Sequence, residues 1–193
     1  MTELGTNVSA VRCRMCMPSE EDGCRSFLLP TGSEDLHADW SCSQCQNIIS
    51  NKTIVMLIKG LKNKVKEKDG DLPGVLDLLT NLKEFLHPNH FMILELKQKW
   101  VNMVSKSEKN DKETLETIIN FIYDIMKINK KIDPGLTLTL GENLKLLNTA
   151  MLNLGKIKME AGEINQKEFM NIALGAAANI KFAKKCFETS YSE

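Results

Sequence analysis

The sequence predicts a mainly α-helical protein that begins with a small cysteine-rich module. Two observations lead to this prediction. Four of the six cysteines stand in two CxxC pairs within the first 46 residues. From residue 47 onward, apolar residues recur every three or four positions, which is the period of amphipathic helices. We therefore expect a metal-binding module at residues 1–46 and a helical domain at residues 47–193.

The two CxxC pairs are Cys13 with Cys16 and Cys42 with Cys45, and 25 residues separate them. Four thiolates in two such turns can close a tetrahedral shell around one zinc ion, and this spacing is typical of structural zinc sites. A catalytic zinc keeps one position open, which a set of four cysteines does not. We expect a zinc-ribbon-like module with these four cysteines as ligands.

The segment between the pairs predicts one short strand and contains two alternative candidate metal ligands. Residues 27–30 read as an apolar strand that Pro30 and Gly32 end. Trp40, two residues before the second pair, has a ring that could pack over the metal. Cys24 or His37 could replace one of the cysteines. We favour the four CxxC sulfurs because they already satisfy a closed site.

Composition and the absence of targeting segments in the sequence predict the cellular location. Among 193 residues, 42% are hydrophobic and 26% are charged, as in soluble globular proteins. The sequence contains neither an apolar run of membrane-spanning length nor a signal peptide at its start. We expect a cytoplasmic or nuclear protein with no membrane contact. In a reducing compartment, clustered CxxC pairs favour metal over disulfides.

Charge is distributed unevenly. The chain has no net charge, but residues 1–46 carry three arginines against seven acidic residues, a net charge of −4, and the remainder carries +4. Proteins that bind nucleic acid neutralise phosphates with lysine and arginine. The acidic module therefore argues against a transcription-type zinc ribbon, and we expect no nucleic-acid partner.

Helical periodicity after the second pair divides into about six segments. Breaks fall at 69–74, where glycines and Pro73 interrupt the pattern, at Asp133-Pro134-Gly135 and at Gly162. Short connections imply antiparallel neighbours packed in pairs. The expected helices are residues 47–68, 75–86, 91–104, 113–132, 139–161 and 165–189.

The last two helices suggest a tetratricopeptide-like (TPR-like) repeat. Leu154-Gly155 followed by Gly162 matches the first helix and turn of that repeat, whereas the small residues at 173 and 175–178 fall out of register. We therefore expect TPR-like helical hairpins that do not follow the repeat's consensus. Such a domain would present a concave face to a protein or peptide.

No other group of residues predicts catalysis or cofactor binding. His87 and His90 flank a Pro-Asn turn, where we expect capping rather than metal ligation. Cys186 is isolated and reads as a small buried hydrophobe. No GxGxxG, P-loop or Ser/His/Asp pattern occurs. Most methionines fall in helical segments, and the carboxylate pairs Asp77/Glu84 and Glu113/Glu116 read as solvated helix faces.

Several short sequence segments resemble those of a known protein family. They are residues 2–6, 9–13, 28–30, 38–40, 86–90 (Leu-His-Pro-Asn-His) and 132–135 (Ile-Asp-Pro-Gly), together with the second CxxC pair. In this order the chain resembles the C-terminal part of SET-and-MYND (SMYD-type) proteins, of the insect SmydA branch. These similar segments are distributed over nearly the whole chain.

The resemblance implies relatives that are protein-lysine methyltransferases. Such relatives have a SET core that binds S-adenosylmethionine, a MYND finger, a post-SET zinc region and a TPR-like C-terminal domain. The chain lacks the Asn-His-Ser-Cys word of the SET domain and a MYND cysteine array. We therefore expect a zinc-binding and partner-binding or substrate-gating region that is not catalytic on its own. The alternative is that the chain is a fragment of an active methyltransferase. The sequence of the upstream reading frame would distinguish the two interpretations.

Overall fold

The computed structural model describes residues 6–16, 26–32, 35, 37–68, 70–106 and 110–190. Contacts divide the chain into two compact units, Met1–Leu96 and Lys97–Glu193. The first holds a small sheet, two helices and the start of a third, and the second is helical. The predicted mainly α fold with a small cysteine cluster near its start is confirmed. The expected domain boundary after residue 46 stays a prediction.

The sheet of the first unit is a four-stranded antiparallel meander in the order β1-β2-β3-β4. Its centre joins Val11 to Leu28 and Leu28 to Cys42. The predicted strand at residues 27–30 is confirmed as β2. The strands are β1 (Val11–Arg12), β2 (Phe27–Pro30), β3 (Trp40–Cys42) and β4 (Ile48–Ile49).

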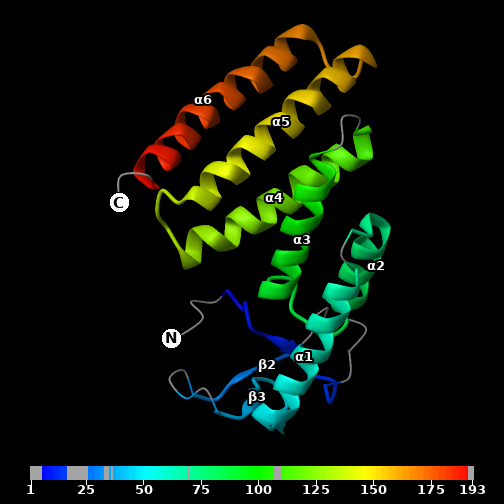
Figure 1. Cartoon of the computed structure of the whole chain (residues 1–193), viewed down its shortest axis with the longest axis vertical. Helices are drawn as coiled ribbons and strands as arrows, with labels where there is room; N and C mark the ends of the chain where they lie inside the picture. The colour runs from blue at the N-terminus through cyan, green and yellow to red at the C-terminus, as the bar shows by residue number, and fades with distance from the viewer. Residues whose placement is uncertain are drawn as a thin grey trace. The chain divides into compact units, whose positions relative to one another are not determined.

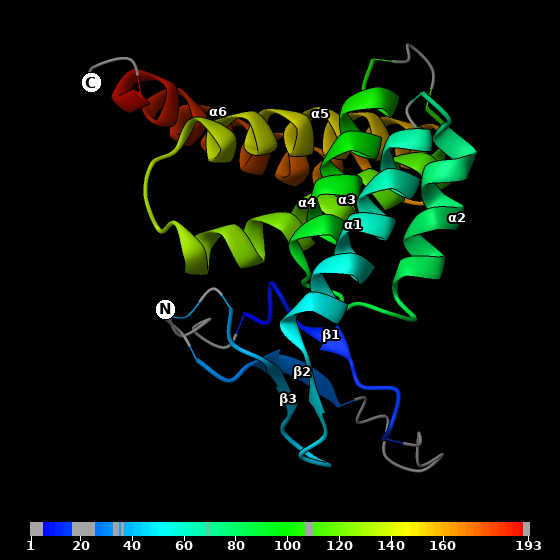
Figure 2. The same ribbon diagram turned by 60° about the horizontal axis from the view of Figure 1, so that its bottom comes forward.

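The start of the first helix corrects the sequence prediction. Ile48 and Ile49, expected in the helix, form β4, and α1 (Asn51–Glu67) begins after Ser50, whose side chain accepts a hydrogen bond from the N–H of Thr53. β-Branched apolar residues fit a half-buried strand as well as a helix face, so their periodicity did not separate the two. Figure 2 shows α1 rising from the strands.

α2 (Leu72–Leu82) begins three residues before its predicted start and ends four before its predicted end. Asp71 caps it by accepting from the N–H of Gly74. Pro73 is tolerated because the N–H groups of the first turn have no partner within the helix. After Leu82 the chain turns, and Leu86 forms a bridge with Val11. The predicted helix at 91–104 is confirmed as α3 (Phe91–Val104).

Three long helices build the second unit, with α4 against α5 and α5 against α6 (Figure 1). Asp111 caps α4, Thr137 caps α5, and Asn165 and Glu168 form a reciprocal capping box on α6. Each helix starts and ends within one residue of its prediction. Their bounds are α4 (Lys112–Ile132), α5 (Leu138–Glu160) and α6 (Gln166–Ser190).

Close packing of α5 on α6 explains two glycines. A Cβ added at Gly155 would lie 3.1 Å from the ring of Phe169, and one added at Gly141 would lie 3.1 Å from the Cβ of Cys186. Cys186 is fully buried, as expected for a small hydrophobe. Gly155, taken above as part of a repeat pattern, therefore allows two helices to approach. The TPR-like repeat itself stays a prediction.

No helix in the part of the chain that the structure describes combines the length and the apolar character needed to span a bilayer.

Candidate metal centre

The sheet brings the two CxxC turns together. β1 and β3 both pair antiparallel with β2, so they run in the same direction on either side of it. Cys13 directly follows β1 and Cys42 ends β3. Because the ends of these two strands lie at one edge of the sheet, the turns that follow them meet there.

The four sulfurs converge on one point. The Sγ atoms of Cys13 and Cys45 are 3.6 Å apart, as are those of Cys16 and Cys42. All four Sγ atoms lie within 4.8 Å of one another. A zinc–sulfur bond of about 2.3 Å implies sulfurs about 3.8 Å apart in a tetrahedron, whereas a disulfide bond measures about 2.05 Å. The cysteines are unpaired thiols, and their spacing fits a single zinc ion.

The second turn is arranged around Cys42. The N–H of Gln44 donates to Cys42 Sγ over 3.4 Å, and the N–H of Gln46 donates to the Cys42 carbonyl over 3.0 Å. The chain leaves the turn through Gln46, which has a φ of 58°, in the left-handed region where glycine is usual. The Cys42 N–H then donates to the carbonyl of Asn47. The backbone thus fixes where one sulfur points.

The sulfurs differ in acidity. Burial raises the pKa of the Cys42 thiol, but the N–H groups of Cys45 and Gln44 outweigh it and lower this pKa to about 6. The N–H of Asn47 favours the Cys45 thiolate, but the neighbouring sulfurs and burial raise the pKa of Cys45 to about 12. Four thiolates this close repel one another, so a divalent cation is the group that would allow all four to ionise.

The other predicted candidates lie apart from the cluster. His37 is exposed, and its backbone N–H donates to the Asp35 carboxylate over 2.8 Å. Among the described residues, the grouping of possible metal ligands contains only the four cysteines. Cys24 lies outside the described residues. The indole N–H of Trp40 donates to Asn51 at the start of α1, and its packing over the metal stays a prediction.

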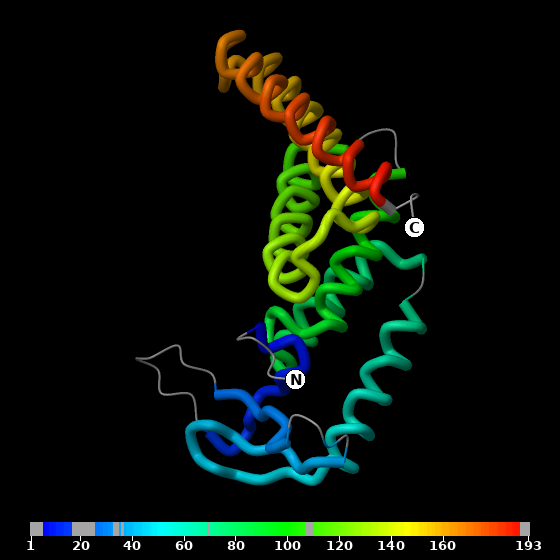
Figure 3. Tube along the Cα trace, turned by 90° about the vertical axis from the view of Figure 1, so that its left-hand side faces the viewer, coloured from blue at the N-terminus to red at the C-terminus, as the bar shows by residue number. Residues whose placement is uncertain are grey.

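The segment before the first CxxC pair forms backbone hydrogen bonds with the turn before α3. The N–H of Arg12 donates to the Phe85 carbonyl, that of His87 to Ala10 and that of Phe91 to Val8. Figure 3 shows the dark blue segment beside the start of α3. This pairing across about 75 residues had no signal in the sequence. It attaches the metal-binding edge to the helices of the first unit.

One ring nitrogen of each histidine in this turn accepts a hydrogen bond from the backbone. Nδ1 of His87 accepts from the N–H of Asn89, and Nδ1 of His90 accepts from the N–H of Met92 in the first turn of α3. The side chain that accepts from a helix-end amide is thus His90, whereas His87 accepts within the turn and the Asn89 side chain donates to the Thr6 carbonyl. Burial, with the positive charge of Arg12, lowers the pKa of His87, and burial, with His87 beside it, lowers that of His90 to about 4.

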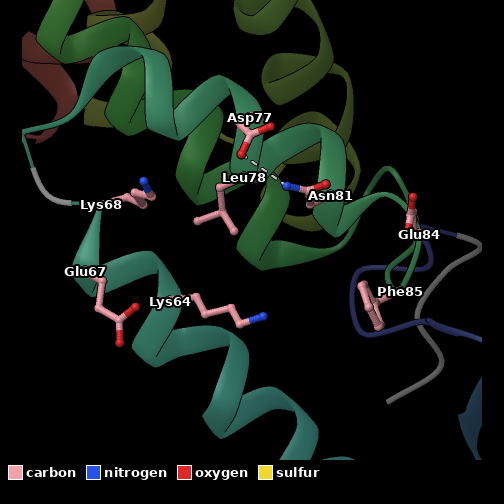
Figure 4. A pocket seen from close by; sticks show the side chains of 8 residues that line it. All are labelled: Lys64, Glu67, Lys68, Asp77, Leu78, Asn81, Glu84 and Phe85. Carbon is pink, nitrogen blue, oxygen red and sulfur yellow. Dashed lines mark hydrogen bonds between the residues drawn. The ribbon is translucent and has the colours of Figure 1, made fainter.

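A cavity of about 370 Å³ between α1 and α2 carries charges of both signs. Figure 4 shows Asp77 beside Asn81 on α2, while Glu84 lies apart from them near Phe85. Asn81 donates to the Asp77 carboxylate over 3.2 Å. Asp77 and Glu84 are both exposed, but Glu84 lies beyond the end of α2 rather than on a helix face, and the absence of a catalytic role stays a prediction.

Comparison with known proteins gives one distant similarity. A stretch of 116 residues is 25% identical to the SET domain-containing protein SmydA-8 of Drosophila melanogaster, isoforms A and B. The chain is distantly similar to a SET-domain protein. The match covers 58% of this chain but only 24% of isoform B and 23% of isoform A, so it spans about a quarter of these relatives. No protein-family model matches the chain.

Proposed function

We propose that this chain is a zinc-binding, helical region of a SMYD-type protein, and that it binds a protein or peptide without catalysing a reaction itself. The observation that carries the proposal is the closed set of four cysteine sulfurs. Four thiolates would fill a tetrahedral zinc ion and leave no position for water or substrate, which is typical of structural sites. The distant similarity to SmydA-8 supports the relationship to SMYD proteins.

Zinc would act on the fold. The ion offsets the repulsion of four thiolates, and its binding energy becomes folding energy for a sheet with strands of two to four residues. Cys13, Cys16, Cys42 and Cys45 would hold it. Through the backbone bonds to Phe85 and His87, the ion would also fix the start of α3.

The helical unit offers a place for the partner. A cavity of about 670 Å³ lies between α4, α5, α6 and the α4–α5 turn, and its size falls in the range of binding pockets. Apolar side chains from all three helices line it, together with two lysines of α4 and one carboxylate, that of Asp133, so positive charge is in excess. This mixture favours a peptide with an apolar side chain next to acidic residues. The lining includes Tyr123, Leu140, Phe182, Lys127 and Lys130.

Fluorescence anisotropy tests this binding with labelled peptides that hold one leucine or phenylalanine flanked by aspartates. We expect saturable binding that Phe182→Ala and Lys130→Gln weaken. Lys145→Gln, a charge change on α5 outside the cavity, is the matched control and is expected to bind as the unchanged protein does. Equal binding by all variants, or none by any, would refute the partner proposal.

A methyltransferase is the second candidate, and the similarity to SET domain-containing relatives favours it. A longer form of the protein would then bind S-adenosylmethionine in a SET core, with this chain gating the substrate or packing against that core. Calorimetry with S-adenosylmethionine and a radiolabelled methyl-transfer assay separate the candidates. We expect neither binding nor transfer by this chain, and both by a longer reading frame if the second candidate holds. Under both candidates we propose a cytoplasmic or nuclear location, with neither membrane nor nucleic acid as a partner.

A further inference from the structure

A second cavity of the first unit has a different chemistry from the metal centre. It measures about 420 Å³ and lies between the starts of α1 and α3, beside β3. Its wall is mostly apolar, with the rings of Trp40 and Phe91 and the aliphatic side chains of Ile54, Val55 and Ile58. A concave, mainly apolar surface with a few polar groups is the usual form of a small-molecule site.

The charges in this cavity are all positive. Lys59 and Lys62 line it, and no carboxylate is among the described residues that do so. The amino group of Lys62 lies 5.6 Å from the centre of the Phe91 ring. The nearby carboxylate of Asp39 accepts from the N–H of Asn51. The cavity therefore favours an anion.

His90 supplies a hydrogen-bond donor. The residue is fully buried and lines the cavity, and its Nε2 has no hydrogen-bond partner among the described residues. Nδ1 accepts from the N–H of Met92, so Nδ1 carries no proton. Since burial keeps the ring neutral by lowering its pKa to about 4, the single ring proton sits on Nε2. A buried donor without a partner is costly, which marks it as a position for an acceptor.

We propose that this cavity binds a small organic carboxylate with an aromatic or branched aliphatic body. Its body would pack between Trp40 and Phe91, and its carboxylate would meet Lys59, Lys62 and Nε2 of His90. The volume near 420 Å³ lies at the small end of ligand pockets, which suits a molecule of this size. The site is separate from the zinc proposal and from the cavity of the helical unit.

NMR titration of the zinc-loaded full chain with phenylacetate tests the site, with 2-phenylethanol as the uncharged probe of the same body. We expect saturable shifts at Trp40, Val55 and Phe91, and binding of the alcohol weaker by about tenfold or more, because a charge-assisted hydrogen bond is worth that much. Absence of saturable shifts, or equal affinity for both probes, would overturn the proposal.

Variants then locate the carboxylate. Lys62→Gln and His90→Asn are each expected to weaken phenylacetate binding without changing the affinity for 2-phenylethanol. Asparagine keeps an acceptor for the N–H of Met92 but removes the ring donor. Lys66→Gln, on the same helix and outside the cavity, is the matched control. If Lys66→Gln weakens binding as much as Lys62→Gln, only general charge attraction is present and the site is refuted.

Discussion

The sheet of the first unit and the long helices of the second would be stabilised by different means. The first contains a sheet with strands of two to four residues and four sulfurs at its edge, while the second contains helices of 21, 23 and 25 residues that pack in series. Short strands bury little apolar surface, so a bound metal would add the stability that side-chain packing within the sheet does not supply. Long amphipathic helices bury whole rows of side chains. Changes to the metal and changes to the core should therefore affect different units.

The largest effect is expected from Cys42→Ser. A serine hydroxyl does not replace a thiolate, so the protein should lose stoichiometric zinc and the sheet should unfold. Helices α4 to α6 should remain, because α5 packs against α4 and α6 within the second unit. Far-ultraviolet circular dichroism would follow the helices, and NMR the signals of residues 11–49. Serine at Cys186, which is buried in the second unit, should leave the zinc content unchanged.

Ile122→Ala is expected to destabilise the second unit and to leave the zinc content unchanged. Ile122 is fully buried on α4, in a row with Ile118 and Ile125. Its truncation should cost about 3 kcal/mol of the free energy of unfolding of the second unit, within the range for buried isoleucine. Urea unfolding measures this cost and metal analysis the zinc content. Lost zinc in this variant would show that the units do not separate as described.

His90 should make the first unit sensitive to acid. The folded pKa of about 4 lies below the ordinary value of 6.5, so the neutral ring stabilises the fold above pH 6.5, and this stabilisation is lost as pH falls toward 4. The difference corresponds to roughly 3 kcal/mol. His90→Asn keeps the capping acceptor but does not titrate, so its stability should fall less over this interval. Comparing the two proteins removes the acid loss of metal that both share, and identical pH profiles would contradict the assignment.

The smallest effect is expected at Gln46. Its positive φ costs a non-glycine residue about 1 kcal/mol, so Gln46→Gly should raise the stability of the zinc-loaded first unit by about that amount or less. Gln44→Gly in the same turn is the control and should be neutral or destabilising. Thermal unfolding of both variants measures the difference, and a destabilised Gln46→Gly would show that the side chain has a role of its own.

The parts of this structure that sequence predicted are those with a local signal. The spacing of Cys13, Cys16, Cys42 and Cys45 identified four sulfurs that the structure brings together, and the break at residues 133–135 marked the end of α4 at Ile132. The role of the cysteines as zinc ligands stays a prediction.

Contacts between distant residues were not predictable. The backbone bonds from residues 8–12 to residues 85–91 involve no characteristic side chain, and they leave no pattern in the sequence. The same holds for the cavity around His90, which collects side chains from β3, α1 and α3. Ile48 and Ile49 show a third limit, because two apolar β-branched residues fit either a strand or a helix.

Metal analysis of the purified, unchanged protein tests the central claim most directly. Inductively coupled plasma mass spectrometry after dialysis should find one zinc ion per chain, and a chelator strong enough to remove it should unfold the sheet while α4 to α6 persist. Absence of zinc in a protein whose sheet is folded would contradict the account, because the four sulfurs would then hold their positions without an ion.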